Sequence, residues 1–292
     1  MAGDLFEIIS ADSVQVYKYL DIGSGKPSRA DRDRIRHYLI DWVEPDFHFT
    51  AGEFCREAIK AADEIITRKK LPMIVGGTGL YIDSFFQGLS EIPDVSGDLK
   101  RELNRELKEL GLPHLYREIM QVDPEFGERI HSSDTQRILR GLEVFRGTGK
   151  PLSSFYKNRP SYGSKAALFV GLYEERSVIT KRIEERVDKM ISDGLVDEVR
   201  NLRGMGYGPG LQSMNSIGYA EINSYLDGDM RLDEAVEKIK SVTKKYAKRQ
   251  MTWFRKNKMI HWFKNTELGK IRGLLDHWLD NCFSDHKIIT AR

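Results

Sequence analysis

Residues 7–27, EIISADSVQVYKYLDIGSGKP, are the stretch that decides the expected fold. They begin inside a short apolar run, residues 5–9, which has no helical period and is ended by the polar segment 10–13. A run of this kind predicts a strand buried on both faces of a parallel sheet. Because open α/β sheets bind ligands beyond the carboxyl ends of their strands, we expect Asp12 at a ligand-binding edge. Its carboxylate could act as a general base, hold a metal-bound water, or only cap the next turn.

Length and composition indicate a soluble α/β protein with one large core and an inserted lobe. The chain has 292 residues, of which 31% are charged, and its net charge of +2 does not by itself indicate a polyanionic partner. Cys55 and Cys282 form neither a metal-ligand spacing nor a disulfide framework, which fits a reducing compartment. No apolar run reaches about 18 residues and the N-terminus has no signal pattern. We therefore expect a cytoplasmic monomer without a membrane partner.

Further apolar runs predict additional strands at residues 37–43, 71–75 and 166–172. Residues 49–68 instead have the spacing of an amphipathic helix, with Thr50 as its N-cap and Glu53 completing a capping box. The run at 71–75 is followed by Gly76-Gly77-Thr78-Gly79. Glycines after a strand let backbone N–H groups approach a phosphate at a helix N-terminus, although they could equally make only a tight turn.

Residues 93–162 are charged, rich in helix signals and without a strand signal, so we expect a helical insertion into the core. Ser133 or Asp134 is expected to cap a helix over 135–146, in which Ile138, Leu142 and Phe145 face inward. On another face of this helix the spacing gathers Gln136, Arg137 and Arg140. Such a face can be an ordinary solvated surface or a contact for nucleic acid.

Residues 179–202 predict a long helical stretch interrupted at Gly194. Its apolar side is expected to comprise Ile179, Ile183, Val187, Met190, Val196, Val199 and Leu202. Another side carries basic residues, Arg182, Arg186 and Lys189, and acidic residues close enough to pair with them, Glu184, Glu185 and Asp188. From spacing alone, this side is a salt-bridged surface.

Residues 238–258 contain nine Lys or Arg residues and no Asp or Glu. The same segment carries an apolar stripe of Ile239, Val242, Tyr246 and Trp253. A one-sided basic helix with aromatic residues suits contact with an RNA backbone. A lipid-surface helix and a solubility face are the alternatives. The lack of any other membrane signal favours RNA.

Five segments, in this order, resemble those of the tRNA dimethylallyltransferases, also called the tRNA isopentenyltransferase family. The segments are SADSVQVYKYLDIGSGKP at 10–27, IVGGTGLYI at 74–82, DTQRILRGLEVFRGTGKPLS at 134–153, RIEERVDKMISDGLVDEV at 182–199, and SIGYAE through YAKRQMTWFR at 216–255. The resemblance covers roughly residues 5–263. It implies a P-loop NTPase-like α/β fold, with a mostly parallel sheet flanked by helices. The core would comprise residues 1–92 and 163–292, and the helical insertion 93–162 would contact tRNA.

The resemblance also implies a reaction and its residues. A dimethylallyl group would pass from dimethylallyl diphosphate to the exocyclic amine of the adenosine 3′ of the anticodon, with Mg²⁺ as cofactor and Asp12 and Arg186 as catalytic residues. The diphosphate would be held by Gly76, Gly77, Thr78, Gly79 and Arg186. The anticodon arm of tRNA would be bound by Asp12, Ser13, Val14, Gln15, Gln136, Arg137, Ile138, Leu139, Arg140, Asn215, Ser216, Ile217, Gly218, Tyr219, Lys248 and Arg249. No residue is assigned as a metal ligand.

One part of the family pattern is missing from this sequence. Family members begin with a strand and a phosphate-binding loop of the form G-x-x-x-x-G-K-[ST]. The stretch at Gly23–Lys26 does not supply that loop, because Leu20 stands where its first glycine is required and Pro27 replaces the Ser or Thr. We interpret the chain as a fragment or as one whose start is assigned too late. Since each preorganised donor contributes roughly 10²–10³ in rate, this chain is expected to be close to inactive.

Three other functions fit parts of the pattern. A non-catalytic RNA-binding protein would keep the basic helix and show no affinity for diphosphate. A small-molecule kinase of the P-loop class would share the core and need no basic surface. An isopentenyltransferase acting on free adenine nucleotides would modify AMP but not tRNA.

Overall fold

The computed structural model describes residues 5–89, 92, 95–157 and 167–284. The chain divides into two compact units, each with its own hydrophobic core. The first comprises Met1–Phe86 and Tyr162–Arg292, and the second comprises Gln87–Ser161.

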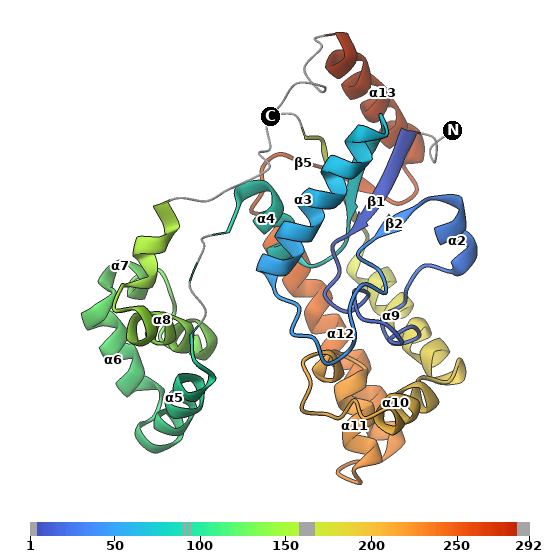
Figure 1. Cartoon of the computed structure of the whole chain (residues 1–292). Helices are drawn as coiled ribbons and strands as arrows, with labels where there is room; N and C mark the ends of the chain where they lie inside the picture. Colours follow the sequence, from blue (N-terminus) through green and yellow to red (C-terminus); the bar gives the residue numbers. More distant parts are fainter. Residues whose placement is uncertain (1–4, 90–91, 93–94, 158–166, 285–292) are drawn as a thin grey trace. The chain divides into compact units, whose positions relative to one another are not determined.

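The strands of the first unit lie in two parallel sheets (Figure 1). The order β2-β1-β3 joins β1 (Phe6–Ser10), β2 (His37–Tyr38) and β3 (Leu71–Val75), with Ile9 of β1 opposite Tyr38 and Ile74. The other sheet pairs β4 (Phe169–Tyr173) with β5 (Ile260–Lys264). Because β1 and β3 are parallel and in register, with Ser10 opposite Val75, the loops after them leave the sheet at the same edge.

Two strand predictions need correction, and one strand was missed. The expected strand at 37–43 ends after Tyr38, since Leu39 and Asp41 have φ values of 62° and 53°, which interrupt extended backbone. The strand expected at 166–172 starts at Phe169, and its first predicted residue lies outside the described residues. This strand is not buried on both faces, because Val170 and Leu172 are 41% and 58% exposed. No apolar run predicted β5.

Helix α3 (Ala51–Thr67) packs on β1 and β3 (Figure 1). The predicted N-cap is confirmed, because the Thr50 side chain accepts a hydrogen bond from the N–H of Glu53. Its buried face includes Phe54, Ala58, Ala62 and Ile65. Two shorter helices, α2 (Arg29–Arg34) and α4 (Gly79–Gln87), follow β1 and β3 in the chain.

The remaining helices of this unit are α9 (Arg176–Ser192), α10 (Leu195–Gly204), α11 (Tyr219–Leu226), α12 (Leu232–Phe254) and α13 (Leu268–Ser284), with a short 3₁₀ turn η2 at Ser213–Asn215. Gly194, with φ 102°, separates α9 from α10 as expected. The predicted apolar side is confirmed, since Ile183, Val187, Val199 and Leu202 are buried. Helix α12 packs against both α9 and α11.

The second unit is built from helices in its described residues: α5 (Gly97–Leu110), α6 (Leu112–Val122), α7 (Pro124–Gly127), α8 (Thr135–Thr148) and the 3₁₀ turn η1 (Leu152–Lys157). Of the two predicted caps for α8, Asp134 is the observed one, accepting from the N–H of Arg137. Ile138 and Leu142 are fully buried, as predicted. Arg146 joins three helices by pairing with Glu106 of α5 (2.8 Å) and Glu118 of α6 (2.7 Å).

Candidate active site

The loops that follow β1 and β3 are joined by backbone hydrogen bonds. The N–H of Ala11 donates to the carbonyl of Val75 (2.8 Å), and the N–H of Thr78 donates to the carbonyl of Ala11 (3.1 Å). The N–H of Ser13 donates to Thr78 Oγ1 (3.1 Å). Glycine is required at Gly76, because a Cβ there would lie 2.2 Å from the Ala11 carbonyl oxygen. The two loops therefore form one surface at the sheet edge where α/β proteins bind ligands.

Asp12 lies in the first of these loops and caps the turn after β1. Its Oδ1 accepts hydrogen bonds from the N–H groups of Val14 (2.8 Å) and Gln15 (3.1 Å). Its Oδ2 has no hydrogen-bond donor in the described part of the chain. One oxygen thus has the capping role that the sequence left open, while the other is free to accept a proton. The pKa of the Tyr246 hydroxyl is raised, mainly because the group is buried and secondly because the charge of Asp12 is nearby.

Helix α12 covers the glycine loop with three side chains that our reading of the sequence did not assign to the site. Gln250 Nε2 donates to the carbonyl of Gly77 (2.9 Å), and the Tyr246 hydroxyl lies 3.5 Å from the same oxygen. Trp253 packs against Gly79, where a Cβ would lie 2.4 Å from its ring. The spacing of 246, 250 and 253 along one helix face was the available signal.

Arg186 of α9 packs against a turn that belongs to the stretch after β1. Its Nη2 donates to the carbonyl of Ser24 (3.5 Å). Gln15 Nε2 lies at the same distance, 3.5 Å, from that carbonyl and 3.3 Å from the carbonyl of Gly25. Gly25 has φ +61°, and a Cβ on it would lie 2.4 Å from Arg186 Nη2. The backbone conformation therefore favours glycine there, and a larger residue would also displace the end of the Arg186 side chain.

The acidic residues of α9 do not pair with its arginines as the spacing predicted. Glu184 pairs with Lys244 of α12 (2.6 Å), and Asp188 pairs with Lys240 (2.8 Å). These ion pairs link α9 to α12. Within the described residues, Arg186 has no carboxylate partner, so its planar guanidinium is available to an anion.

Gln15 connects the two predicted catalytic residues. Its backbone N–H donates to Asp12, and its side chain shares the Ser24 carbonyl with Arg186. Asp12 and Arg186 therefore belong to one hydrogen-bonded cluster of the first unit, although they lie far apart in the sequence.

Residues 15–257 match a known protein family, IPP transferase. This chain belongs to the IPP transferase family. It is 47% identical over 265 residues to tRNA dimethylallyltransferase 2 of Geotalea uraniireducens, covering 89% of this chain and 84% of that protein. It is 44% identical over 267 residues to the tRNA dimethylallyltransferase of Acetivibrio thermocellus, with the same two coverages.

Two solved structures of related proteins superpose on this IPP transferase family member. The tRNA isopentenylpyrophosphate transferase of Bacillus halodurans gives a TM-score of 0.68 at 33% identity, covering 96% of this chain and 90% of that one. A eukaryotic dimethylallyltransferase acting on tRNA gives 0.77 at 25% identity, covering 98% and 75%. These matches confirm the family resemblance and the predicted α/β fold class.

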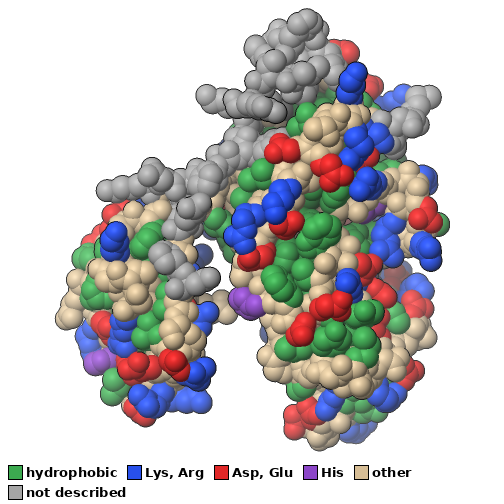
Figure 2. Space-filling view, in the orientation of Figure 1, with side chains coloured by type: hydrophobic (Ala, Val, Ile, Leu, Met, Phe, Trp, Pro, Cys, Tyr) green, Lys and Arg blue, Asp and Glu red, His purple; other side chains and the backbone are tan. Residues whose placement is uncertain are grey.

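The basic residues of α12 in this IPP transferase family member fall into two groups. Lys240 and Lys244 are bound to acids of α9. Lys245 and Lys248 are exposed and have no acidic partner in the part of the chain that the structure describes. Arg249 stacks over Tyr246, with its Cζ 5.7 Å from the ring centroid. On the face drawn in Figure 2, basic and acidic side chains are mixed.

In the second unit, the predicted polar face of α8 is only partly free. Gln136 and Arg137 are exposed, with Arg137 paired to Asp134 (3.5 Å), whereas Arg140 reaches the buried carboxylate of Glu143 (3.1 Å). Ile138 is fully buried in this unit's core, so its side chain packs rather than faces solvent, and Leu139 is half-buried against the same core.

The predicted tRNA-contacting segment 215–219 contains both exposed residues and residues that are buried in the fold. Asn215 is exposed, and its Nδ2 donates to the carbonyls of Pro209 and Leu211, both at 2.9 Å. Ser216 and Ile217 are half-buried. Tyr219 is fully buried, and Gly218 before it has φ 95°. The fully buried side chain of Tyr219 supports the fold and does not face a solvent-borne ligand.

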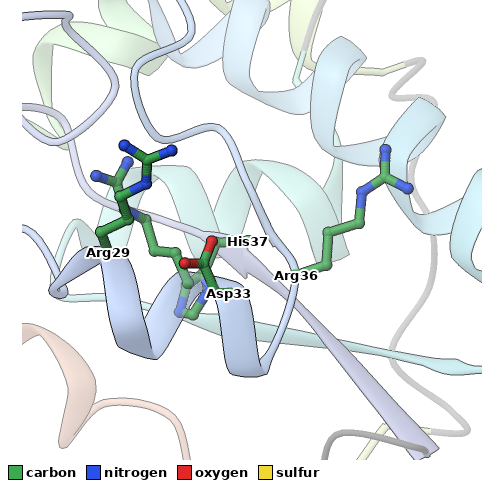
Figure 3. A pocket seen from close by; sticks show the side chains of 5 residues that line it. Arg29, Asp33, Arg36 and His37 are labelled. Atoms are coloured by element: carbon green, nitrogen blue, oxygen red, sulfur yellow. The ribbon is translucent and has the colours of Figure 1, made fainter.

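A separate surface pocket of about 630 Å³ contains none of the predicted site residues. It is lined by Arg29, Arg32, Asp33, Arg36 and His37 (Figure 3). Arg32 pairs with Asp41 (2.6 Å), and Arg36 points away from the other labelled side chains toward its partner Glu64 (3.6 Å). Two of the three arginines that line the pocket are therefore engaged with carboxylates. None of the helices in the described ranges has the length and hydropathy to cross a membrane.

Proposed function

We propose that this chain transfers a dimethylallyl group from dimethylallyl diphosphate to the exocyclic amine of the adenosine immediately 3′ of the anticodon in tRNA. The observation that carries the proposal is the free Oδ2 of Asp12, held beside the glycine loop and linked through Gln15 to Arg186. The names of the related proteins support the same class of reaction.

Asp12 is proposed to accept the proton. The amine nitrogen forms a bond to C1 of the dimethylallyl group while the bond from C1 to the diphosphate oxygen breaks. The bonding electron pair leaves with the diphosphate, and an amine proton passes to Asp12 Oδ2. Because Oδ1 is fixed by two backbone N–H groups, Oδ2 is oriented before substrate binds.

The adenine must leave the base stack to reach this carboxylate. We propose that residues 13–15 seat the extruded base. The amide of Gln15 is already used by Ser10 Oγ (3.2 Å) and by the turn at 24–25, so its part is to hold the loop in place. Thr78 holds Ser13 in the same way.

The departing diphosphate needs positive groups as its charge develops. We assign this role to Arg186 and to the N–H groups of the glycine loop. In the described part of the chain, the N–H groups of Gly77 and Gly79 have no acceptor of their own, and Gly79 begins α4. Free N–H groups at a helix N-terminus suit phosphate oxygens.

We propose Mg²⁺ as the cofactor. Within the described residues, no three His, Cys, Asp or Glu side chains gather into a metal site. Mg²⁺ is commonly held by one or two carboxylates together with substrate phosphates and water, so an ion that arrives with the diphosphate would need few protein ligands. It would supply positive charge to that group. Asp12 stays assigned to the proton.

We propose one tRNA-binding surface in each unit. The surface of the first unit comprises segment 215–218 and the free basic residues of α12, including Lys248 and Arg249. In the second unit the exposed residues of α8, Gln136 and Arg137, are proposed to contact tRNA together with Arg140. Basic side chains bind an RNA backbone through release of counterions, and Arg137 and Arg140 would exchange their present partners, Asp134 and Glu143, for phosphates.

The test is incubation of the chain with labelled dimethylallyl diphosphate, Mg²⁺ and either unmodified tRNA or AMP. We expect slow labelling of the adenosine 3′ of the anticodon, in keeping with the low activity expected from the sequence, and no label on AMP. Label on AMP but not on tRNA would replace this function with prenylation of free nucleotides. Binding of tRNA without binding of diphosphate would indicate a non-catalytic RNA-binding protein.

A further inference from the structure

Glu198 of α10 is hydrogen-bonded to a turn far from it in sequence. Its carboxylate accepts from the backbone N–H groups of Asp21 (3.1 Å), Ile22 (2.7 Å) and Gly23 (3.2 Å). It also accepts from the hydroxyl of Tyr219 (2.6 Å). Three successive N–H groups of one turn thus converge on a single anion, an arrangement of charge-assisted bonds that fixes the backbone strongly.

Tyr219 packs against the same turn and supports this contact. Its ring occupies the space beside Gly23, where a Cβ would lie 2.5 Å from the ring. Burial, followed by the charge of Glu198, raises the pKa of Tyr219 well above its ordinary value. The phenol therefore stays protonated and keeps donating to the carboxylate.

The turn held by Glu198 continues directly into the backbone that contacts Arg186. The Ser24 hydroxyl donates back to the carbonyls of Leu20 (2.5 Å) and Asp21 (3.2 Å), so hydrogen bonds within the turn hold residues 20–25 together. The outward carbonyls of Ser24 and Gly25 meet Arg186 and Gln15. Glu198 touches neither Arg186 nor Asp12 and acts only through this turn.

We propose that Glu198, supported by Tyr219, is a positioning residue for the transfer reaction: it fixes turn 21–25, which sets where Arg186 meets the diphosphate and keeps Gln15 on Asp12. This inference rests on the proposed function. Loss of the carboxylate leaves three N–H groups without their acceptor and lets the turn relax. A displacement of about 1 Å at a positioning group can cost about a hundredfold in rate.

The test compares wild type, Glu198→Gln, Arg186→Gln and the double variant, with Asp197→Asn as the matched control. Asp197 is the exposed neighbour of Glu198 and pairs only with Arg200 within the described residues. For each protein, Kd for inorganic pyrophosphate, Kd for tRNA, and kcat/KM for dimethylallyl diphosphate are measured. Tyr219→Phe removes one hydroxyl and serves as a second, milder variant if Glu198→Gln does not fold.

We expect Glu198→Gln to weaken pyrophosphate binding and lower kcat/KM by about tenfold to a hundredfold while tRNA binding changes less than twofold. Since Glu198 acts through Arg186, the double variant should lose much less than the product of the two single losses. If the losses of the two single variants multiply in the double variant, Glu198 does not act through Arg186. That result, or a loss of tRNA affinity as large as the loss of pyrophosphate affinity in Glu198→Gln, would overturn the positioning role and leave only a role in stability. An inactive wild type that binds pyrophosphate would overturn the proposed function alone, because pyrophosphate binding still tests Glu198.

Discussion

Gln250 donates a hydrogen bond to the carbonyl of Gly77 across 2.9 Å, and so joins the basic helix α12 to the glycine loop after β3. Residue 250 lies 173 positions after residue 77, yet its side chain fills the space beside that glycine. The helix proposed to contact tRNA and the loop proposed to hold diphosphate are thereby in direct contact.

Replacement of Gln250 by Leu should uncouple these two parts. Leu keeps most of the volume and loses the hydrogen bond to Gly77, so we expect kcat/KM for dimethylallyl diphosphate to fall by about tenfold to a hundredfold. Steady-state kinetics with saturating tRNA measure the effect. Thr252→Ala is the control, because Thr252 is exposed on the same helix and bonds only to its own backbone at Lys248. Equal kinetics for the two variants would contradict the role of Gln250.

Replacement of Gly76 by Ala should destabilise the first unit. Its Cβ would meet the Ala11 backbone, which cannot move without breaking the join between the two loops. We expect a loss of about 1–3 kcal/mol in the free energy of unfolding, measured in urea. Gly204→Ala is the matched control, since no heavy atom lies within 4 Å of a Cβ there and it should be neutral or slightly stabilising.

Replacement of Lys248 by Ala should weaken tRNA binding without affecting diphosphate. Lys248 is exposed, so its loss removes charge and little packing. We expect the slope of log Kd for tRNA against log salt concentration to fall by about 1, with an unchanged Kd for pyrophosphate. Lys60→Ala, on the surface of α3 and paired with Glu57, should leave the slope as it is. An unaltered slope for Lys248→Ala would remove this residue from the proposed tRNA surface.

Local chemistry was readable from the sequence where neighbouring residues decide it. The cap at Thr50, the break at Gly194 and the position of Asp12 after a strand depend on adjacent residues and are observed. Partners chosen by tertiary packing were not readable. Glu184 and Asp188 could pair along their own helix by spacing, but α12 brings lysines closer.

The contacts of Glu198 and Gln250 show the same limit more strongly. Glu198 accepts hydrogen bonds from N–H groups that lie 175 to 177 residues away in the sequence, and no periodicity within α10 indicates these partners. The strand expected at 37–43 failed for a related reason. Its apolar residues suit a strand, but the positive φ values at Leu39 and Asp41 arise where that segment packs beside the turn after β1.

Glu7 should make the stability of the first unit depend on pH. It is a buried carboxylate on β1. Burial works to raise its pKa, but hydrogen bonds from Arg68 and Lys70 outweigh this, and the pKa of Glu7 is lowered in the folded chain. A lowered pKa contributes stability above the unfolded value, and that contribution is lost as pH falls through the folded value. Glu7→Gln should therefore cost about 1–3 kcal/mol at pH 7 and much less near pH 3.

Urea unfolding of wild type and Glu7→Gln at several pH values measures this difference. Glu57→Gln is the control, since Glu57 pairs only with exposed Lys60 in the described residues. A difference between wild type and Glu7→Gln that stays constant down to pH 3 would mean that the ion pairs of Glu7 do not contribute.

The central claim is that Asp12 accepts the proton, and Asp12→Asn tests it most directly. Asn retains an oxygen that can accept from Val14 and Gln15, so the turn should stay folded while the basic oxygen is lost. The measurement is single-turnover transfer of the dimethylallyl group to tRNA at saturating substrates, with Kd for tRNA and pyrophosphate determined alongside. We expect transfer to fall by at least about 10²-fold, with both affinities within about twofold of wild type. Transfer at the wild-type rate by Asp12→Asn would contradict it.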